Sequence, residues 1–510
     1  MSDPSTSEES KPIGVPVPPI AITGDASTAT SVIEAETVSI PDNVRRALES
    51  ACGEVNDDPA VLADEGRDWW PLAMIWATEG RVPARASLLV RPGSPNEVAD
   101  VLRICNDNHI PVSPSAGRSG VLGASVPLFG GVQLDMCRLD GIRDVDETSL
   151  LADVLPGTFG NVYEHTLGDA GYTGGHWPQS MDLSTVGGWL ACRGAGQFST
   201  RYGKIEDIVV GLDVVLADGT AISTGGYPRE AVGPDLNQLF VGSEGTLGVI
   251  TGARLKIHPL PDYRRQAAYS FDSLETGLEW VRSVIQRGAR PAVLRLYDPL
   301  EADRHFGTGA ERAAAVVLDE GEPAIVDAYM AVVESAANDH DGTREDDSIV
   351  DSWLEKRNEV SALEALISRG FIVDTMEVSG RWADLVSIAQ NTLEALRAAP
   401  GALAAGVHCS HSYEAGACLY FTFAAESEPS ARQLNHQSIW ESATRAVLEA
   451  GGSLSHHHGV GINRSRFVAD ALGGGMEVLQ SLKDALDPNG ILNPGKLGLS
   501  SPFGTYSYVG

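Results

Sequence analysis

The sequence predicts an α+β protein with more than one domain, and three observations lead to this fold class. At 510 residues, the chain is too long for one ordinary hydrophobic core. Between residues 132 and 258, short β-type runs are separated by glycine turns. After about residue 262, longer helical stretches alternate with strands. The first pattern indicates a sheet-rich domain, and the second indicates a separate α+β domain with an antiparallel sheet.

Composition and charge exclude several kinds of protein. Hydrophobic residues make up 43% and charged residues 21% of the chain, as in globular proteins. The 37 Lys and Arg against 69 Asp and Glu give a net charge of −32, which argues against nucleic-acid binding and adsorption to anionic membranes. There is no secretory signal and no apolar run near the roughly 20 residues of a membrane span. We therefore expect a cytoplasmic protein with reduced cysteines, and the sequence leaves open whether it forms a homodimer.

Changes in residue pattern place the domain limits. Residues 1–45, rich in Ser, Thr, Pro and acids, predict a flexible acidic tail. Residues 46–262 form the first domain, residues 263–436 a cap domain, residues 437–498 a C-terminal segment, and residues 499–510 a second tail. Within these limits we expect helices at 273–287, 324–337 and 355–368, strands at 292–297 and 418–424, and a hairpin turn at Asp218-Gly219.

A β–α–β unit lies near the start of the first domain. Residues 86–92 predict a strand, and Ser94, followed by proline and then Glu97, predicts the start of a helix. The strand Ile110–Ser113 completes the unit, and the loop Pro114–Gly123 after it carries glycines at three-residue spacing. The backbone N–H groups of such a loop suit a pyrophosphate, and an ordinary glycine-rich loop is the alternative. Since the loop is not a GxGxxG fingerprint opening a helix, NAD binding is disfavoured.

Two later segments are also rich in small residues. Gly174–Gly196 and Gly233–Thr251 place many glycines beside Ser and Thr, which indicates close backbone approach to a ligand. The order PxxGRSG, DLSTVGG and GSEGTLGVIT resembles the FAD-binding, PCMH-type domain of the vanillyl-alcohol-oxidase family, which has two subdomains. In that family the first loop holds the pyrophosphate of FAD, and the later segments run along the rest of the cofactor.

The resemblance implies a set of cofactor-binding residues in this chain. It also implies non-covalent FAD, because the first loop offers neither the His nor the Cys that attaches FAD in some members. The C-terminal segment is expected to close on the flavin. The implied residues are Pro114, Ser115, Ala116, Gly117, Arg118, Ser119 and Gly120; Gln179, Ser180, Met181, Asp182, Leu183, Ser184 and Thr185; Cys192, Arg193, Gly194 and Ala195; and Glu244, Gly245, Thr246, Leu247, Gly248, Val249 and Ile250.

Motifs in the second half narrow the resemblance. Gly451–Gly461, with three consecutive histidines, Ser412–Phe421 and Leu294–Asp298 look like the alkylglycerone-phosphate synthases of ether-lipid synthesis. The similarity covers about residues 60–498. These enzymes exchange the acyl group of acyl-dihydroxyacetone phosphate for a long-chain alcohol, with FAD acting as an electrophile and no net redox change. The implied partner is therefore a small-molecule or lipid-like substrate.

The same resemblance assigns catalytic and substrate-binding residues. Tyr420 is implied to remove a proton from the substrate carbon, one of His456, His457 and His458 to handle the alcohol, and Arg295 to contact substrate. On an extended segment, His456 and His458 would lie on one face and His457 on the other. A metal site or a packed polar cluster is the alternative use of the three histidines. No metal is expected, because the chain shows no matching ligand motif such as HExxH.

Two departures from the synthases leave other functions open. Leu363 stands where the synthases carry a phosphate-binding Arg, and Ile462 stands where they carry a Lys, for which Arg464 is a candidate replacement. The alternatives are a FAD-linked oxidase or D-2-hydroxyacid dehydrogenase, and a non-catalytic flavin-binding protein. Residues 408–417 keep a His but lack the GHxGDGNxH metal-binding motif usual in those dehydrogenases. Intact Tyr420 and the three histidines argue against a non-catalytic protein.

Overall fold

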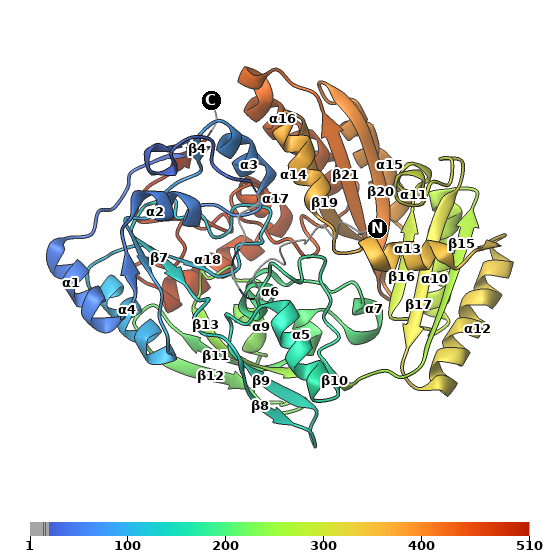
Figure 1. The fold of residues 1–510 in the computed structure, drawn as a ribbon, viewed down its shortest axis with the longest axis horizontal. Coiled ribbons are helices and arrows are strands. Elements are labelled where there is room, and N and C mark those ends of the chain that lie inside the picture. The colour runs from blue at the N-terminus through green and yellow to red at the C-terminus, as the bar shows by residue number, and fades with distance from the viewer. Residues whose placement is uncertain (1–13, 15, 17–19, 509–510) are drawn as a thin grey trace, which may run out of the picture.

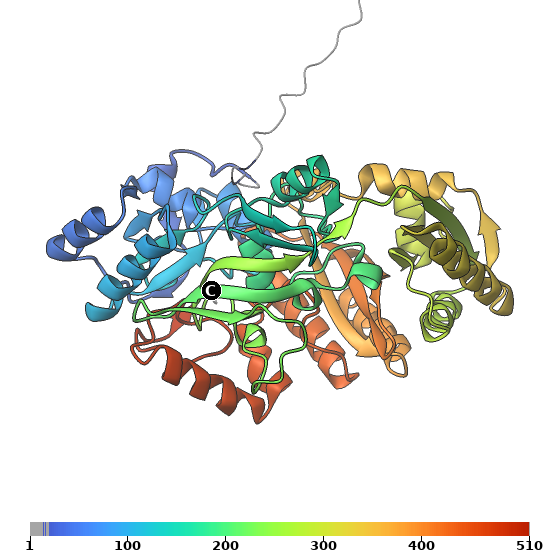
Figure 2. The ribbon, with the colours of Figure 1, turned by 90° about the horizontal axis from the view of Figure 1, so that it is seen from below.

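The computed structural model describes residues 14, 16 and 20–508, which form two sheet-containing regions in the first half and a larger sheet in the cap. Figures 1 and 2 show the first half at one end of the molecule and the cap at the other. The segment after residue 437 returns to the first half, where Leu492 bridges Val112 of the first sheet. The sequence predicted that residues 437–498 close on the flavin, and this stays a prediction.

The first sheet has the order β3-β5-β7-β6. Strands β5 (Leu88–Val90), β6 (Val112–Ser115) and β7 (Val132–Asp135) are parallel, because helix α4 (Pro95–Asp107) makes the crossover. Ser94 caps α4 by accepting from the N–H of Glu97, which confirms the predicted helix start. The other elements here are α1 (Asp42–Ala51), β3 (Val55–Asn56), α2 (Pro59–Glu65), α3 (Pro71–Thr78) and β4 (Arg81–Val82).

The second sheet is antiparallel and has the order β12-β11-β13-β9-β8. The predicted hairpin joins β11 (Val209–Val215) to β12 (Ala221–Gly225), and Gly219 in its turn has a φ of +82°, which glycine adopts without strain. The remaining elements are β8 (Ile142–Asp146), β9 (Leu151–Val154), α5 (Gly160–Asp169), β10 (Tyr172–Thr173), α6 (Val186–Cys192), α7 (Ser199–Tyr202), α8 (Ile205–Ile208), α9 (Asn237–Phe240), β13 (Val249–Lys256) and β14 (His258–Pro259).

The cap is built on a seven-stranded antiparallel sheet of order β18-β15-β17-β16-β20-β21-β19. Helices cover both faces, so strand β17 (Ala313–Glu320) is buried along its whole length. The remaining elements are β15 (Arg264–Phe271), α10 (Leu274–Gln286), β16 (Val293–Tyr297), α11 (Pro299–Phe306), α12 (Pro323–Asp339), β18 (Thr343–Glu345), α13 (Ser348–Lys356), α14 (Ser361–Ser368), β19 (Ile372–Arg381), α15 (Leu385–Arg397), β20 (Ala402–Ser412) and β21 (Gly416–Ala425).

The helix predicted over residues 355–368 is instead the end of α13 and the separate helix α14. The break falls at 357–360, where side chains of the first half hold the backbone: Gln197 donates to the carbonyl of Arg357, and Gln179 to that of Glu359. These contacts with another domain override the local helical preference.

The predicted tails are packed segments wherever the structure describes them. Ile20 and Ile33 are buried in the largest apolar cluster, and β2 (Glu34–Ala35) pairs with β22 (Tyr506–Ser507). The ring of Tyr508 contacts those of two buried tryptophans of the first half, Trp70 and Trp76. Isolated apolar residues without periodicity carry this packing, which is why the sequence pattern did not reveal it. The predicted tail residues 1–13, 15, 17–19 and 509–510 lie outside the described residues.

The C-terminal segment contains η2 (Pro429–Ala431), α16 (Arg432–Glu449), η3 (Ser465–Phe467), α17 (Val468–Leu472) and α18 (Gly475–Leu486), and the N-terminal stretch contains η1 (Ala26–Thr28) and β1 (Thr30–Ser31). In the described part of the chain, none of these or the other helices combines the length and apolar character needed to cross a membrane.

Candidate active site

The three histidines lie on a loop, Ser455–Gly461, which we call the histidine loop. The sequence predicted an extended segment here, and this is wrong: the backbone bends, and successive rings stay close together. Ring centroids are 5.1 Å apart for His456 and His457, and 4.6 Å apart for His457 and His458. The bend follows from hydrogen bonds that draw consecutive backbone N–H groups toward one carboxylate.

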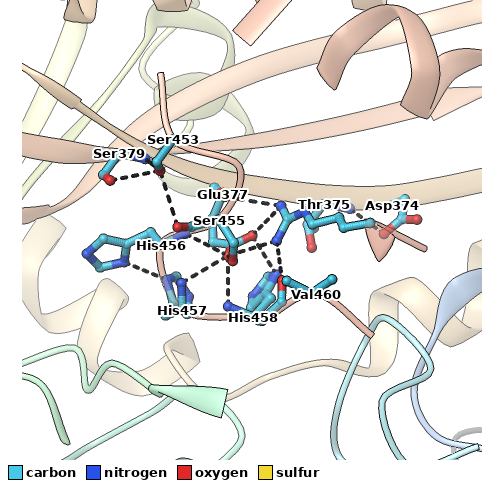
Figure 3. Close-up of polar contacts among 12 residues, drawn as sticks. Asp374, Thr375, Glu377, Ser379, Ser453, Ser455, His456, His457, His458 and Val460 are labelled. Carbon is cyan, nitrogen blue, oxygen red and sulfur yellow. Dashed lines mark hydrogen bonds and ion pairs between the residues drawn. The ribbon is translucent and has the colours of Figure 1, made fainter. Parts of the chain in front are cut away.

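That carboxylate belongs to Glu377 of strand β19 in the cap. Its Oε1 accepts from the backbone N–H groups of His456, His457 and His458 at 3.2, 3.0 and 2.7 Å. The Ser455 hydroxyl donates to the same oxygen at 2.7 Å. Figure 3 shows Glu377 at the centre of this arrangement, with the loop curled beneath it. Consecutive N–H groups aimed at one anion form an anion-binding concavity.

Arg464 neutralises Glu377. Its Nη2 lies 2.8 Å from Oε2 of Glu377, both side chains are fully buried, and the guanidinium lies 5.2 Å from the ring centroid of Trp440. Burial alone would raise the pKa of Glu377, but Arg464 and the neighbouring histidines outweigh burial and hold that pKa well below its usual value. Arg464, predicted to contact substrate in place of a lysine, is thus occupied by Glu377.

A second carboxylate holds the loop from the first half of the chain. Glu244 accepts from the N–H of Val460 at 2.5 Å and from that of Gly461 at 2.9 Å. Glu244 was predicted to contact the cofactor, and here it binds the histidine loop. The loop is therefore fixed between the cap and the first half by one acid from each, so its position depends on both domains.

Tyr420 lies beside this loop, directly across from Glu377 in the β19–β21 pairing. Its ring stacks on His408 at 4.9 Å and contacts the ring of His458 edge-on at 5.5 Å. Burial raises the pKa of the Tyr420 hydroxyl, so it is protonated near neutral pH. Tyr420 is a hydrogen-bond donor at rest, and accepting a proton requires it first to give up its own.

Arg295 is a buried cation on the far side of His408. Its Nη2 lies 2.9 Å from His408 Nε2, and its Nε donates to the Tyr297 hydroxyl at 3.1 Å. Among the described residues, no carboxylate lies within ion-pair distance of this guanidinium. Burial lowers the pKa of His408 to about 4, so its Nε2 is free to accept from Arg295. A guanidinium buried without an acid is suited to an anionic ligand.

The predicted cofactor segments meet backbone to backbone. A Cβ on Gly117 would lie 2.3 Å from the carbonyl oxygen of Leu183, and one on Gly196 would lie 2.6 Å from the backbone nitrogen of Trp177. Buried polar atoms nearby have no hydrogen-bond partner: Oγ of Ser115, both ring nitrogens of His176, and the amide of Asn463. Close glycine packing and unpaired polar atoms fit an extended polar cofactor, which would satisfy those atoms.

Several predicted cofactor residues have other contacts in the structure. Arg118 pairs with Glu65, and Arg193 donates to Gln238. Met181, Leu247, Val249 and Ile250 pack in apolar clusters. The residues that converge most clearly are the Gly117 loop, the segment at Leu183, and Cys192, whose Cβ lies 3.8 Å from the Cβ position of Gly459 in the histidine loop.

The sequence did not predict four contributors to the site: Glu377, Ser199, His411 and Tyr413. Ser199 Oγ lies 2.7 Å from His411 Nδ1, and the Tyr413 hydroxyl lies 2.8 Å from His456 Nε2. Ligand atoms of His411, His456 and His457 lie within 4.8 Å of one another, a spacing suited to a metal ion. His411 lies in the stretch 408–417 and Tyr413 in the motif Ser412–Phe421, so both stood in segments that the sequence singled out without assigning these two residues a role. The expectation of no metal stays a prediction.

Comparison with known proteins identifies the family. Residues 86–225 match a family model described as "FAD binding domain", and residues 260–497 match "FAD linked oxidases, C-terminal domain". An FAD-linked oxidoreductase of Escherichia coli O157:H7, YgcU, is 32% identical over 426 residues, covering 80% of this chain and 88% of its own. The chain belongs to the FAD-linked oxidases. FAD is therefore its cofactor, as the sequence predicted.

Other relatives of this chain include the alkyldihydroxyacetonephosphate synthase of Caenorhabditis elegans, 28% identical over 82% of this chain and 77% of the synthase. A solved structure of an alkyldihydroxyacetonephosphate synthase superposes with a TM-score of 0.76 at 24% identity, covering 92% of this chain and 89% of that one. p-Cresol methylhydroxylase gives 0.71 at 16% identity, covering 92% and 99%. These superpositions confirm the predicted fold: a PCMH-type FAD-binding domain with a cap.

Proposed function

We propose that this FAD-linked oxidase family member is an alkylglycerone-phosphate-synthase-like enzyme, which exchanges the acyl group of acyl-dihydroxyacetone phosphate for a long-chain alcohol. One observation carries the proposal. The ring of Tyr420 lies between the histidine loop on one side and His408 on the other. His408 is hydrogen-bonded to Arg295, a cation that has no carboxylate partner among the described residues. A group that binds an anion and groups that move protons thus lie on opposite sides of one phenol. The similarity to synthases from several organisms supports the same reaction.

The residues divide the work as follows. Arg295 binds the anionic part of the substrate and places the reacting carbon near Tyr420. Tyr420 passes its proton to the neighbouring imidazole of His457 as its oxygen takes one from the substrate carbon; their ring centroids are 6.1 Å apart. FAD, which the Gly117 loop and the segment at Leu183 would hold, would supply an electron-accepting ring. We further propose that FAD is dissociable, because residues 114–120 contain neither His nor Cys.

A second candidate function is oxidation of a 2-hydroxy acid. Leu363 packs against the largest apolar cluster, and Arg464 is occupied by Glu377, which leaves Arg295 as the cation beside Tyr420. One guanidinium suits a carboxylate, which it can bind through two parallel hydrogen bonds. Glycolate oxidase subunit GlcD of Bacillus subtilis is 26% identical over 80% of this chain and 88% of its own length. This similarity supports the alternative.

The visible absorption spectrum of the purified protein separates the two candidates. We expect an oxidised flavin spectrum that D-2-hydroxy acids do not bleach under anaerobic conditions, and release of the flavin on acid precipitation. Acyl-dihydroxyacetone phosphate and a long-chain alcohol should then yield the ether product, and Tyr420→Phe should abolish that yield while keeping the flavin. Bleaching by a hydroxy acid would establish the oxidase instead. Neither bleaching nor exchange would leave a flavin-binding protein without either activity.

A further inference from the structure

The histidine loop continues into a chain of hydrogen bonds that leads away from Tyr420. The Tyr413 hydroxyl lies 2.8 Å from Nε2 of His456, and Nδ1 of His456 lies 2.8 Å from Nδ1 of His457. Tyr413 stands in the turn between β20 and β21 and is half-buried. Lys204 donates to the backbone carbonyl of His456 at 2.7 Å and holds the middle member in place. The chain therefore runs from the half-buried Tyr413 to a ring beside Tyr420.

Proton counting limits this chain to two arrangements. The Nδ1 atoms of His456 and His457 are 2.8 Å apart, a hydrogen bond in which one nitrogen carries the proton and the other is bare. A neutral imidazole carries one N–H, so each ring donates through one nitrogen and accepts through the other. Either Tyr413 donates to His456, which donates to His457, or both hydrogen bonds run the opposite way. In the first arrangement His457 carries its proton on Nε2, and in the second Nε2 is bare.

We propose that Tyr413, His456 and His457 form a proton relay that switches Nε2 of His457 between acid and base. The proposal rests on the proposed function in one respect: the histidine loop serves the reacting groups. Tyr413 acts through the histidines and does not touch substrate, so it is a positioning and proton-conducting residue.

The transfer balances without any change in electrons. In the acid step, the Nε2–H bond of His457 breaks and the proton goes to an oxygen of the leaving group. The proton on His456 Nδ1 moves to His457 Nδ1, the Tyr413 proton moves to His456 Nε2, and water protonates the Tyr413 oxygen. In the base step, bare His457 Nε2 takes a proton from the incoming hydroxyl, and the same transfers run in reverse, returning a proton to water.

The charged and titratable groups around the relay come from every packed element. Lys204 lies 3.1 Å from Glu206 of α8, so that cation is already paired. Glu377 and His458 act on the histidines from β19 and the loop, and Glu206, Asp207 and Cys418 act on Tyr413. His411 from β20 stacks on His456 at 5.0 Å and is also neutral, because burial lowers its pKa. The pH dependence of relay variants has to be compared with this background.

Tyr413→Phe tests the relay, with Tyr227→Phe, at a 70% exposed position, as the matched control. We expect Tyr413→Phe to lower kcat about 10²-fold, to change the solvent deuterium isotope effect on kcat, and to leave flavin content unchanged. Nitrogen-15 spectra of the histidine-labelled holoenzyme should show loss of the hydrogen bond at His456 Nε2. That measurement needs no substrate, so failure of the relay and failure of the assigned reaction are distinguishable.

A second comparison separates conduction from packing. If protons pass through both residues, Tyr413→Phe/His456→Gln should be no slower than His456→Gln alone, because either change breaks the same path. If the losses in kcat of the two single variants multiply in the double variant, the relay is overturned. An unchanged solvent isotope effect in Tyr413→Phe would overturn it as well. Loss of activity with a chelator, restored by Zn²⁺, would also overturn it, since a metal on His411, His456 and His457 occupies the nitrogens that the relay requires.

Discussion

Glu377 and Glu244 hold the same loop from opposite sides, but their electrostatic surroundings differ. Glu377 accepts from three consecutive loop N–H groups and is paired with the buried Arg464. Glu244 accepts from two loop N–H groups and has no cation within ion-pair distance among the described residues. Burial therefore raises the pKa of Glu244, whereas the pKa of Glu377 is held well below its usual value.

The two acids therefore anchor the histidine loop in different ways: Glu377 stays charged, which we call the fixed anchor, and the charge of Glu244 depends on pH. The cap side of the loop is attached through a full charge that its own cation maintains. The first-half side is attached through backbone donors alone, which stabilise the charge less than burial opposes it. The loop is thus held more firmly by the cap than by the flavin-binding half.

Removing the fixed anchor should have the largest effect. Glu377→Ala leaves Arg464 buried without a carboxylate, with only backbone carbonyls as acceptors, and three N–H groups without an acceptor, so we expect a loss of about 3–5 kcal/mol in the free energy of unfolding. Urea denaturation of the holoenzyme measures it. Glu441→Ala, which removes a 45% exposed partner of Arg445, is the control and should cost at most about 1 kcal/mol. Equal losses in the two variants would show that the Glu377–Arg464 pair does not anchor the loop.

A double substitution separates stability from loop geometry. In Glu377→Leu/Arg464→Met, apolar side chains of similar size replace both charges, a change that is often neutral for stability. We expect most of the stability lost in Glu377→Ala to return, but not the activity, because the loop N–H groups still lack their acceptor. Recovery of turnover in the double variant would mean that the bend of the histidine loop does not depend on Glu377.

The smallest effect is in the pH dependence of stability, where the two acids act with opposite sign. From the ordinary glutamate value of 4.5, the lowered pKa of Glu377 adds stability that is lost as pH falls through that pKa. The raised pKa of Glu244 means that stability falls as pH rises from 4.5 to that pKa. The free energy of unfolding should be measured against pH for both variants. In Glu377→Gln, the rise in stability with pH below 4.5 should disappear. In Glu244→Gln, the fall in stability as pH rises above 4.5 should disappear. The same slope in both variants would contradict the assignment.

Local chemistry made much of the fold predictable. The cap at Ser94, the turn at Gly219 and the helix that begins after Ser273 depend on neighbouring residues, and each was found where expected. The break between α13 and α14 was missed because it is imposed by Gln197 and Gln179 from another domain. Buried Tyr508 was missed because the tryptophans on which its ring packs lie more than 400 residues away in sequence.

The site divides in the same way. Tyr420 and the three histidines were identified through motifs, and the structure brings them together. Glu377 carries no motif, and its role depends on a loop 79 to 81 residues further along the chain. The extended conformation predicted for the histidines was wrong for that reason, because residue spacing carries no information about a distant carboxylate that binds the loop backbone.

The contact between Tyr508 and the tryptophans of helix α3 also bears on how the chain is made. Trp70 and Trp76 leave the ribosome more than 400 residues before the ring that packs on them. At about 5–20 residues per second, this corresponds to a delay on the order of 20–90 s. Gln433 and Gln437 also donate to the Tyr508 carbonyl, so this corner of the protein closes only after residue 508 has been made.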